Sequence, residues 1–261
     1  MRLLAQPRIE VNGRPPSAEQ FPLPLVNHGH FTAMQVRGGR TRGLDLHLAR
    51  LDGATRELFG DALDGDQVRN HIRHALGDDT PDASVRVYVY WPDGDDAASI
   101  VVTVRPPAPS PKSPQSLRSV GYQRPAAHIK HLGGFGQAYY GRQAVREGFD
   151  DALLTGHGGV IAESGIANIG FFDGTSVVWP DEPSLHGITM QLLEPRLPDI
   201  GIESRRGPVR LADVTGFEAV FITNSHGVAA VGRIDDMTLP TGHDVVEAAA
   251  RLYESVPWDV I

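Results

Sequence analysis

Apolar residues alternate or recur at helical spacing through the first hundred residues, and these two patterns predict strands and helices in turn. Strands are predicted at "RIEVNG" (8–13), which ends in an Asn-Gly turn signal, and at "FTAMQVR" (31–37). Apolar side chains recur every three or four residues over 44–60, which predicts a helix with one buried face that ends at Gly60.

The same reading predicts a second helix and two more strands before residue 110. The helix fits residues 65–77, and Asp64 or Asp66 could cap its first turn. The strands follow at "SVRVYVYW" (84–91), which alternates, and at "SIVVTVR" (99–105), which is nearly all apolar.

A change in composition then indicates a boundary, because "RPPAPSPKSPQS" (105–116) carries five prolines and few apolar residues. We expect a small N-terminal α/β domain over residues 1–110, a linker over 111–126 and a larger C-terminal domain over 127–261. The C-terminal part alternates strands with helices, which favours a two-domain α/β (α+β) architecture.

A short helix is predicted where "GITMQLLEPRLPDIG" (187–201) begins, and it stops at the prolines of this segment. Two longer helices are also predicted within that C-terminal part. One covers residues 134–149, where at least one of Tyr139 and Tyr140 is expected to pack in the core. The other is amphipathic and covers residues 243–256.

Composition excludes several classes of function. The 261 residues carry a formal net charge of −8, which gives no basic surface for nucleic acid. Absence of cysteine excludes disulfides and thiolate chemistry, and the 11 histidines show no metal-ligand spacing, so no metal is predicted. The N-terminal "MRLLAQP" is not a leader pattern, and no apolar run is long enough for a membrane span. A cytoplasmic protein without membrane partners is expected.

Lysine is rare in this chain, which draws attention to the two positions that have it. Lys112 lies in the proline-rich segment, where it serves solubility, and Lys130 lies in "AHIKHLGGFGQAYYG" (127–141). A lysine among glycines and aromatic residues could be a desolvated nucleophilic amine, or it could extend from a helix start to solvent.

Three further segments carry candidate chemistry that is unspecific when each is taken alone. Glu163, after an apolar run, could be a functional carboxylate or a surface one. "HGITM" (186–190) could present backbone N–H groups to an anion at a helix start. "ITNSHG" (222–227) is a turn rich in hydroxyl and amide groups.

Taken in order, these segments resemble the class IV aminotransferases, the fold-type IV pyridoxal-phosphate enzymes. This family includes D-amino-acid transaminases, branched-chain aminotransferases and aminodeoxychorismate lyases. The motifs that carry the resemblance are "HGHFTAMQVRGGR" (28–40), "LHLARL" (46–51), "HIKHL" (128–132), "REGFDDALLTGHGGVIAESGIAN" (146–168) and "LHGIT" (185–189).

The resemblance implies pyridoxal 5'-phosphate as cofactor, bound in the C-terminal domain, and assigns a role to each matching residue. Lys130 would be the catalytic residue that forms a Schiff base with the cofactor. Glu163 would pair with the pyridine nitrogen, and Arg50 would bind the phosphate, with His47 either supporting Arg50 or purely structural. The remaining cofactor contacts implied are Leu185 on the ring, and Ile188, Thr189 and Ser225 on the phosphate.

Substrate contacts are implied less sharply, because the chain departs from each subfamily. Phe135 stands where branched-chain enzymes have tyrosine, Gly133 stands where lyases have asparagine, and "WPDGDDAAS" (91–99) lacks the basic pair of the D-amino-acid transaminases. The candidates are Phe31, Arg86, His226 and Gly227, with Arg37, His28 and His30 as further possibilities.

The resemblance implies a homodimeric transaminase that moves an amino group from an amino acid to a keto acid such as 2-oxoglutarate or pyruvate. The missing tyrosine favours D-amino acids. A first alternative is aminodeoxychorismate lyase activity on the same cofactor, which the "FTAM" and "TNS" segments favour. A second alternative is a cofactor-free binding protein that has kept the fold.

Overall fold

The computed structural model describes residues 8–16, 27–92 and 96–261, and the chain forms two compact units. Unit 1 contains Met1–Pro109, Ile129–Gly133 and Pro257–Ile261; unit 2 contains Ser110–His128 and Gly134–Val256. Two segments of the expected C-terminal domain thus belong to unit 1, and one of them carries Lys130. The N-terminal residues 1–7, on which the leader prediction rests, lie outside the described residues.

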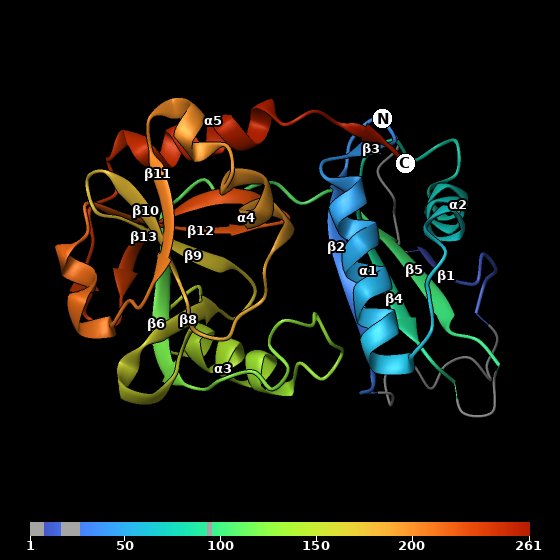
Figure 1. Ribbon diagram of the computed structural model, residues 1–261, viewed down its shortest axis with the longest axis horizontal. Coiled ribbons are helices and arrows are strands. Elements are labelled where there is room, and N and C mark those ends of the chain that lie inside the picture. Colours follow the sequence, from blue (N-terminus) through green and yellow to red (C-terminus); the bar gives the residue numbers. More distant parts are fainter. Residues whose placement is uncertain (1–7, 17–26, 93–95) are drawn as a thin grey trace. The chain divides into compact units, whose positions relative to one another are not determined.

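Unit 1 is a four-stranded antiparallel sheet with two helices on one face (Figure 1). The strand order is β1-β5-β4-β2. Alternate valines of the sheet face the helices, so the period-two pattern and the helical pattern meet in one core. The elements are β1 (Arg8–Val11), β2 (Gly29–Val36), α1 (Leu44–Phe59), α2 (Gly65–Leu76), β4 (Ala83–Tyr90) and β5 (Ser99–Arg105).

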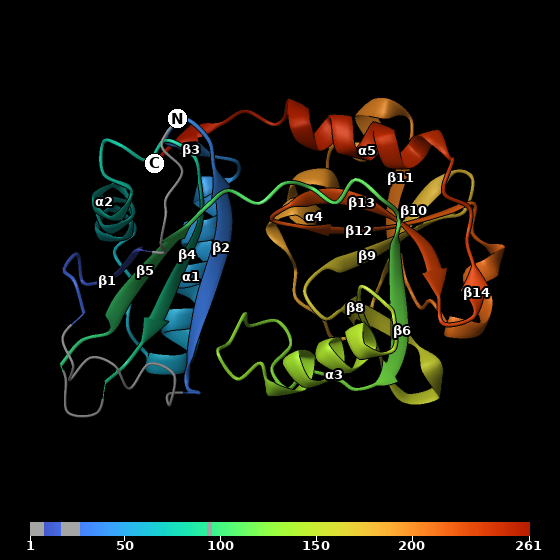
Figure 2. The same cartoon turned by 180° about the vertical axis from the view of Figure 1, so that it is seen from behind.

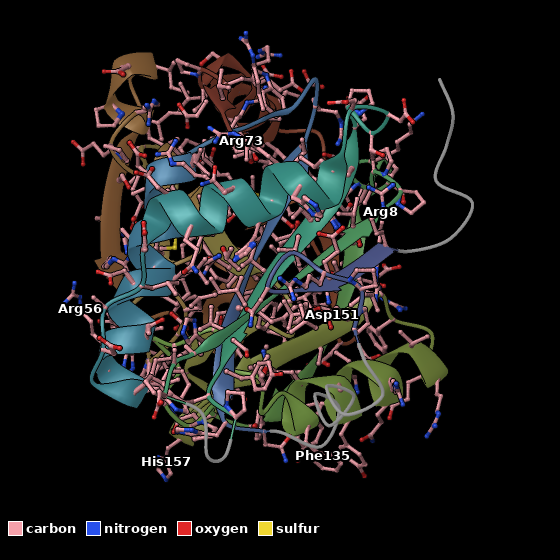
Figure 3. The ribbon with its side chains drawn as sticks, turned by 90° about the vertical axis from the view of Figure 1, so that its right-hand side faces the viewer. Arg8, Arg56, Arg73, Phe135, Asp151 and His157 are labelled. Atoms are coloured by element: carbon pink, nitrogen blue, oxygen red, sulfur yellow. The ribbon has the colours of Figure 1, made fainter. Side chains whose placement is uncertain are left out.

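The predicted helix ends in unit 1 are confirmed. Gly60 follows α1 with a φ of 77°, a left-handed conformation that glycine adopts without strain. The Asp64 side chain accepts hydrogen bonds from the N–H groups of Asp66 and Gln67 and so caps α2. At the other end of α2, Arg8 donates to the carbonyls of Ala75 and Leu76, and Figure 3 labels Arg8 there.

The Lys130 segment extends the sheet of unit 1 at its β2 edge. Phe31 N–H donates to the Lys130 carbonyl at 2.9 Å, and Leu132 N–H donates to the Gly29 carbonyl at 2.8 Å. Glycine is required at position 29, because a Cβ there would lie 2.6 Å from the Val89 carbonyl oxygen and 2.8 Å from Leu132. Backbone pairing therefore fixes the lysine beside β2.

The C-terminal end also returns to unit 1. Strand β15 (Asp259–Val260) pairs with β3 (Arg40–Thr41). Arg73 of α2 donates to the Ile261 carbonyl oxygen at 2.6 Å, and the Leu44 N–H donates to the Asp259 carboxylate at 2.9 Å. The last five residues thus close over unit 1 and do not continue the fold of unit 2.

Unit 2 is built on a sheet with strand order β11-β10-β9-β12-β13-β6-β7-β8, and β14 pairs with β13 (Figure 2). Three apolar clusters fill it, one around Phe171 and Leu117, one around Trp179 and Phe221, and a smaller one around Leu154. The strands are β6 (Gln115–Gly121), β7 (Asp151–Thr155), β8 (Ile161–Ser164), β9 (Asn168–Phe172), β10 (Ser176–Pro180), β11 (Glu203–Gly207), β12 (Ala219–Asn224), β13 (Gly227–Ile234) and β14 (Met237–Thr238).

The helices of unit 2 include the three that the sequence predicts, as α3, α4 and α5. Tyr140 of α3 packs with Ala144, Ala152 and Leu154, whereas Tyr139 is 54% exposed, so one of the two tyrosines packs as expected. The helices are α3 (Phe135–Arg146), α4 (Ile188–Leu193) and α5 (Asp244–Ser255), with short 3-10 helices at His157–Gly159, Leu197–Ile200 and Leu211–Gly216.

Two negative findings apply to the described residues. They contain no helix long and apolar enough to cross a membrane. They also contain no group of three or more metal-ligating side chains that could hold a metal ion.

Candidate active site

Lys130 lies over the exposed face of the unit 1 sheet. Its Nζ is 4.9 Å from the centroid of the Phe31 ring, within the range of a cation–π contact. Phe31 stacks on Tyr88 of β4 with ring centroids 5.4 Å apart, and the Arg86 guanidinium carbon is 6.0 Å from the same Phe31 ring. Phe31, Tyr88 and Arg86 share this face because residues two apart on a strand point the same way and Phe31 pairs with Tyr88.

Arg50 projects from α1 toward β2, within a small cluster of neutral polar groups. Its Nη2 donates to the Thr32 hydroxyl, and the same hydroxyl is 2.6 Å from His47 Nδ1. Burial holds the pKa of His47 well below its ordinary value, and the charges of Arg50 and Lys130 lower it further. The imidazole is therefore neutral, and Thr32 links it to Arg50. The role of His47 as a support for Arg50 is thus the one that the geometry favours.

Arg50 keeps an unused donor in this cluster. Its Nε is buried and has no hydrogen-bond partner among the residues that the structure describes. Burial lowers the pKa of Arg50 to about 10, so the guanidinium still carries its charge at neutral pH. A cation with a free buried donor and only neutral neighbours of this kind is suited to an anionic ligand.

Three other basic residues named as substrate candidates have different surroundings. His30 is buried, its Nε2 lies 2.9 Å from Thr55 Oγ1 of α1, and burial lowers its pKa to about 4. Arg37 donates to the backbone carbonyls of Val36 and Ala108 and so connects the end of β2 to the segment after β5. His28 is exposed and contacts the Phe59 ring edge-on. Arg86 is exposed on the lysine side of the sheet, which sets it apart from these three.

In unit 2, Glu163 lies at the end of β8 in a buried ion pair. Its Oε1 accepts a hydrogen bond from Arg124 Nη1 at 2.9 Å, and its Oε2 accepts one from the Leu185 N–H at 3.2 Å. The side chains of Arg124 and Glu163 are only 3% and 6% exposed. This ion pair holds the Glu163 carboxylate in a fixed orientation inside unit 2.

Asp151 of β7 supports the turn that follows Glu163. Its carboxylate accepts from the Ile166 N–H at 3.2 Å, and a Cβ at Gly165 would lie 2.6 Å from it. Burial raises the pKa of Asp151 above its ordinary value. The small residues of "ESGIAN" thus allow the chain to turn closely over a buried carboxyl group.

Asn168 connects the Glu163 segment to the start of α4. Its Nδ2 donates to the Leu185 carbonyl at 2.6 Å, and its Oδ1 accepts from the Gly187 N–H at 3.1 Å. A side chain at position 187 would collide, because a Cβ there would lie 2.2 Å from Asn168 Oδ1. The asparagine thus fixes both sides of His186 and sets the conformation in which Ile188 and Thr189 begin the helix.

The turn between β12 and β13 is hydrogen-bonded to the start of α4. Thr189 Oγ1 donates to the Asn224 carbonyl at 2.7 Å, and the Asn224 side chain accepts from the His226 N–H at 2.8 Å. Gly227 has a φ of 117°, which a residue with a side chain rarely adopts. Within the described residues, the buried Thr223 Oγ1 has no hydrogen-bond partner. The half-buried Ser225 lies in this turn.

The predicted residues therefore fall into two sets, one in each unit. Unit 1 brings together Lys130, Phe31, Arg50 and Arg86, and unit 2 brings together Glu163, Leu185, Ile188, Thr189, Ser225, His226 and Gly227. Sequence reasoning missed three polar residues that hold these sets in place, namely Thr32, Arg124 and Asn168. Thr32 and Asn168 lie inside quoted motifs, and Arg124 lies six positions before the lysine.

Comparison with known proteins identifies relatives over most of the chain. The family model described as amino-transferase class IV matches residues 29–234, more than half of the sequence. A probable branched-chain-amino-acid aminotransferase from Rickettsia felis is 31% identical over 99 residues, which cover 38% of this chain and 33% of that protein. The chain thus matches about a third of the length of this curated relative.

Solved structures share the fold at lower identity. The PLP-bound form of a hypothetical aminotransferase from Mycobacterium tuberculosis has a TM-score of 0.83 at 19% identity, covering 96% of this chain and 98% of that one. A putative 4-amino-4-deoxychorismate lyase from Legionella pneumophila has a TM-score of 0.81 at 19% identity, covering 90% and 93%. These likenesses confirm the expected two-domain, fold-type IV architecture.

Proposed function

This chain belongs to the class IV aminotransferase family, and from that premise we propose that it transfers the amino group of an amino acid, with D-amino acids preferred, to 2-oxoglutarate or pyruvate. Its cofactor is pyridoxal 5'-phosphate. The observation that carries the proposal is the setting of Lys130, which backbone pairing holds beside β2 with its Nζ over an aromatic ring. In the same unit, Arg50 retains a buried donor for an anion.

The residues present fit this cofactor. A phosphate is a dianion at neutral pH, and the unused Arg50 Nε would meet it with a charge-assisted hydrogen bond. In unit 2 the unused Thr223 Oγ1 and the neighbouring Ser225 offer hydroxyl donors, and the buried Glu163 offers a carboxylate to a cationic ring nitrogen. The residues proposed to hold the cofactor are Lys130, Arg50, Glu163, Leu185, Ile188, Thr189 and Ser225.

When bound, the cofactor supplies an electron sink for negative charge that develops at the substrate α-carbon. The chain supplies the rest. Lys130 Nζ would hold the cofactor, and its amine would serve as the base that moves a proton away from the substrate α-carbon and returns it as an acid. Glu163 holds a positive charge at the ring nitrogen, and Arg50 anchors the phosphate so that Lys130 and the substrate meet in a fixed geometry.

Substrate binding is proposed on the lysine side of the unit 1 sheet. Phe31 offers an apolar ring to the substrate, and Arg86 offers a planar fork to a carboxylate. The Lys130 Nζ lies 4.9 Å from the Phe31 ring centroid, and the Arg86 guanidinium carbon lies 6.0 Å from it. The lysine amine and the guanidinium are therefore both within reach of one small substrate over this ring. The turn at His226 and Gly227 is proposed as a second carboxylate contact.

The preference for D-amino acids rests on position 135. Branched-chain enzymes have tyrosine there, whereas this chain has Phe135, which lacks a hydroxyl and is 81% exposed at the start of α3. Its ring stacks on Tyr139 one turn further along the helix, with centroids 5.8 Å apart, and Figure 3 labels Phe135. As the resemblance implies, we also propose a homodimer that works in the cytoplasm.

A second candidate is aminodeoxychorismate lyase activity with the same cofactor. A structural neighbour with a TM-score of 0.81 carries that name as a putative function. The "FTAM" and "TNS" segments resemble the corresponding lyase turns, and both contribute hydroxyl groups, through Thr32 and Thr223, to the polar clusters described above. Pyruvate release from aminodeoxychorismate without any keto acid acceptor would identify this activity.

The proposal is tested by absorption spectra of the protein loaded with pyridoxal phosphate, recorded before and after addition of D-alanine or L-alanine without acceptor. Loss of the yellow band with D-alanine supports a transaminase that prefers D-amino acids. Loss with L-alanine alone contradicts the stereochemical preference and keeps the reaction. A yellow protein that responds to neither contradicts the transaminase proposal and directs attention to the lyase assay. Lys130→Ala is the matched control and should show no response.

A further inference from the structure

Arg124 makes a buried contact with Glu163 that neither composition nor the motif pattern predicts. Arg124 follows β6 by three residues, and its Nη1 donates both to Glu163 Oε1 and to the Ala127 carbonyl, each at 2.9 Å. One guanidinium thus fixes the carboxylate on β8 and the backbone three residues before Lys130. The contact lies wholly within unit 2.

Physical chemistry gives this contact a consequence for charge. A carboxylate taken out of water tends to take up a proton, because burial in a low dielectric penalises the charged form. A guanidinium cannot lose its proton under these conditions, so at hydrogen-bond distance it favours the ionised carboxylate. The Leu185 N–H donates to the second oxygen and adds to the same preference. Glu163 is therefore held as an anion in a defined orientation before any ligand arrives.

We propose that Arg124 is a positioning residue of the active site, which keeps Glu163 ionised and aimed so that it can hold a proton on the ring nitrogen of the cofactor. The proposal rests on the proposed function, since Glu163 has this task only if pyridoxal phosphate binds. Arg124 itself acts through Glu163.

The direct readout is the protonation state of the ring nitrogen, measured by nitrogen NMR on pyridoxal phosphate that is isotope-labelled at that atom. In the wild-type protein the shift should be that of a protonated pyridine. In Arg124→Met it should move toward that of neutral pyridine, and kcat should fall by roughly ten- to hundredfold, as for other residues that support a contact group from behind. Arg124→Lys should restore much of the protonated signal, because the lysine returns the charge without the fork.

Two comparisons make the outcome decisive. Arg205 forms an ion pair with Asp173, and its side chain is 52% exposed. Arg205→Met is therefore a control for loss of an arginine elsewhere in unit 2, and it should leave the chemical shift of the ring nitrogen unchanged. A protonated wild-type signal with an identical Arg124→Met signal overturns the inference and leaves the proposed function standing. A wild-type protein that takes up no cofactor overturns both.

A stability measurement covers the case in which Arg124→Met folds poorly. Removing one partner of a buried pair leaves an uncompensated charge, whereas removing both does not. The cofactor-free Arg124→Met protein should therefore unfold at lower temperature than wild type, and adding Glu163→Gln should recover at least half of that loss. If the second substitution recovers nothing, Arg124 does not serve the charge of Glu163 and the inference is wrong.

Discussion

Each unit holds an arginine among its candidate site residues, and the two arginines have opposite surroundings. Arg124 is buried beside a carboxylate, whereas Arg50 is half-buried among neutral groups. Arg50 in unit 1 contacts only neutral groups, the Thr32 hydroxyl and through it the His47 imidazole, and its Nε has no partner among the described residues. Arg124 in unit 2 contacts the Glu163 carboxylate and a backbone carbonyl. Within the part of the chain that the structure describes, no carboxylate contacts Arg50, whereas Glu163 neutralises Arg124.

We infer from this difference that the two arginines have different functions, one in binding a ligand and the other in orienting a carboxylate. A cation that has a buried donor without a partner and no counter-charge beside it favours an anion, so we propose that the Arg50 cluster binds an anionic ligand. The Arg124–Glu163 pair is complete before a ligand binds, so it serves to preserve a geometry and a charge. We therefore expect substitutions around Arg50 to change cofactor affinity, and substitutions around Glu163 to change the chemical step.

The largest expected effect is on the chemical step, from Glu163→Gln. The amide keeps the shape but carries no charge for the ring nitrogen, so kcat should fall by roughly hundred- to thousandfold. The dissociation constant of the cofactor, measured by fluorescence titration, should change by much less. An unchanged kcat would show that another group holds the ring nitrogen, and the division between the units would fail.

Arg50→Met should give the reverse pattern. Loss of charge-assisted hydrogen bonds to the phosphate should weaken cofactor binding by roughly ten- to hundredfold. The cofactor-free protein should unfold within about 1 kcal/mol of wild type or above it, because a half-buried cation without a counter-charge has been removed. Denaturant unfolding without cofactor checks the second part, and Arg50→Lys is the control that keeps the charge. A strongly destabilised cofactor-free Arg50→Met would contradict the comparison.

Asn168→Ala tests whether the polar contacts at the start of α4 in unit 2 also contribute to cofactor binding. The alanine removes the two hydrogen bonds that fix Leu185 and Gly187, at an expected cost of about 1–2 kcal/mol in cofactor binding, or roughly tenfold in affinity. Asn70→Ala, on the exposed side of α2, is the matched control. Equal cofactor affinities for wild type and Asn168→Ala would show that the start of α4 holds its conformation without the asparagine.

The effect that concerns catalysis least directly is a pH dependence of stability in unit 1. Burial lowers the pKa of His30 from 6.5 to about 4, so the unfolded chain takes up this proton first as the pH falls. Stability from this group is complete above about pH 6.5 and is lost as the pH drops toward 4, by on the order of 3 kcal/mol. His30→Gln should flatten the stability curve over that window, and His157→Gln, at an exposed imidazole, should not. Parallel curves for His30→Gln and wild type would refute the assignment.

Local patterns predict the elements of this fold well and the long-range pairings poorly. The helix at 44–60 and its Gly60 end follow from local sequence alone, and of the two cap candidates, Asp64 and Asp66, the structure shows Asp64. The strand at Gln115–Gly121 was expected in a linker, because only Leu117 of its seven residues is buried and the apolar alternation is missing. Lys130 was expected in the C-terminal domain, and only its backbone bonds to β2 place it in unit 1.

The same limit applies to the candidate site. Motifs identify Lys130, Arg50 and Glu163, because each has a recognisable neighbourhood in the sequence. Arg124 and Asn168 have no period or motif of their own that predicts a partner, and their roles depend on contacts 39 and 17–19 residues away in sequence. Residues that support a site from behind are thus assigned from three-dimensional contacts and not from spacing.

The central claim is that Lys130 binds the cofactor, and the composition of the chain allows a direct test. The sequence has two lysines, Lys112 in the proline-rich segment and Lys130 beside β2. The protein loaded with pyridoxal phosphate is reduced with borohydride, digested and examined by peptide mass spectrometry. We predict that the reduced cofactor is found on Lys130 and not on Lys112. Cofactor on Lys112, or on neither lysine, would contradict the account.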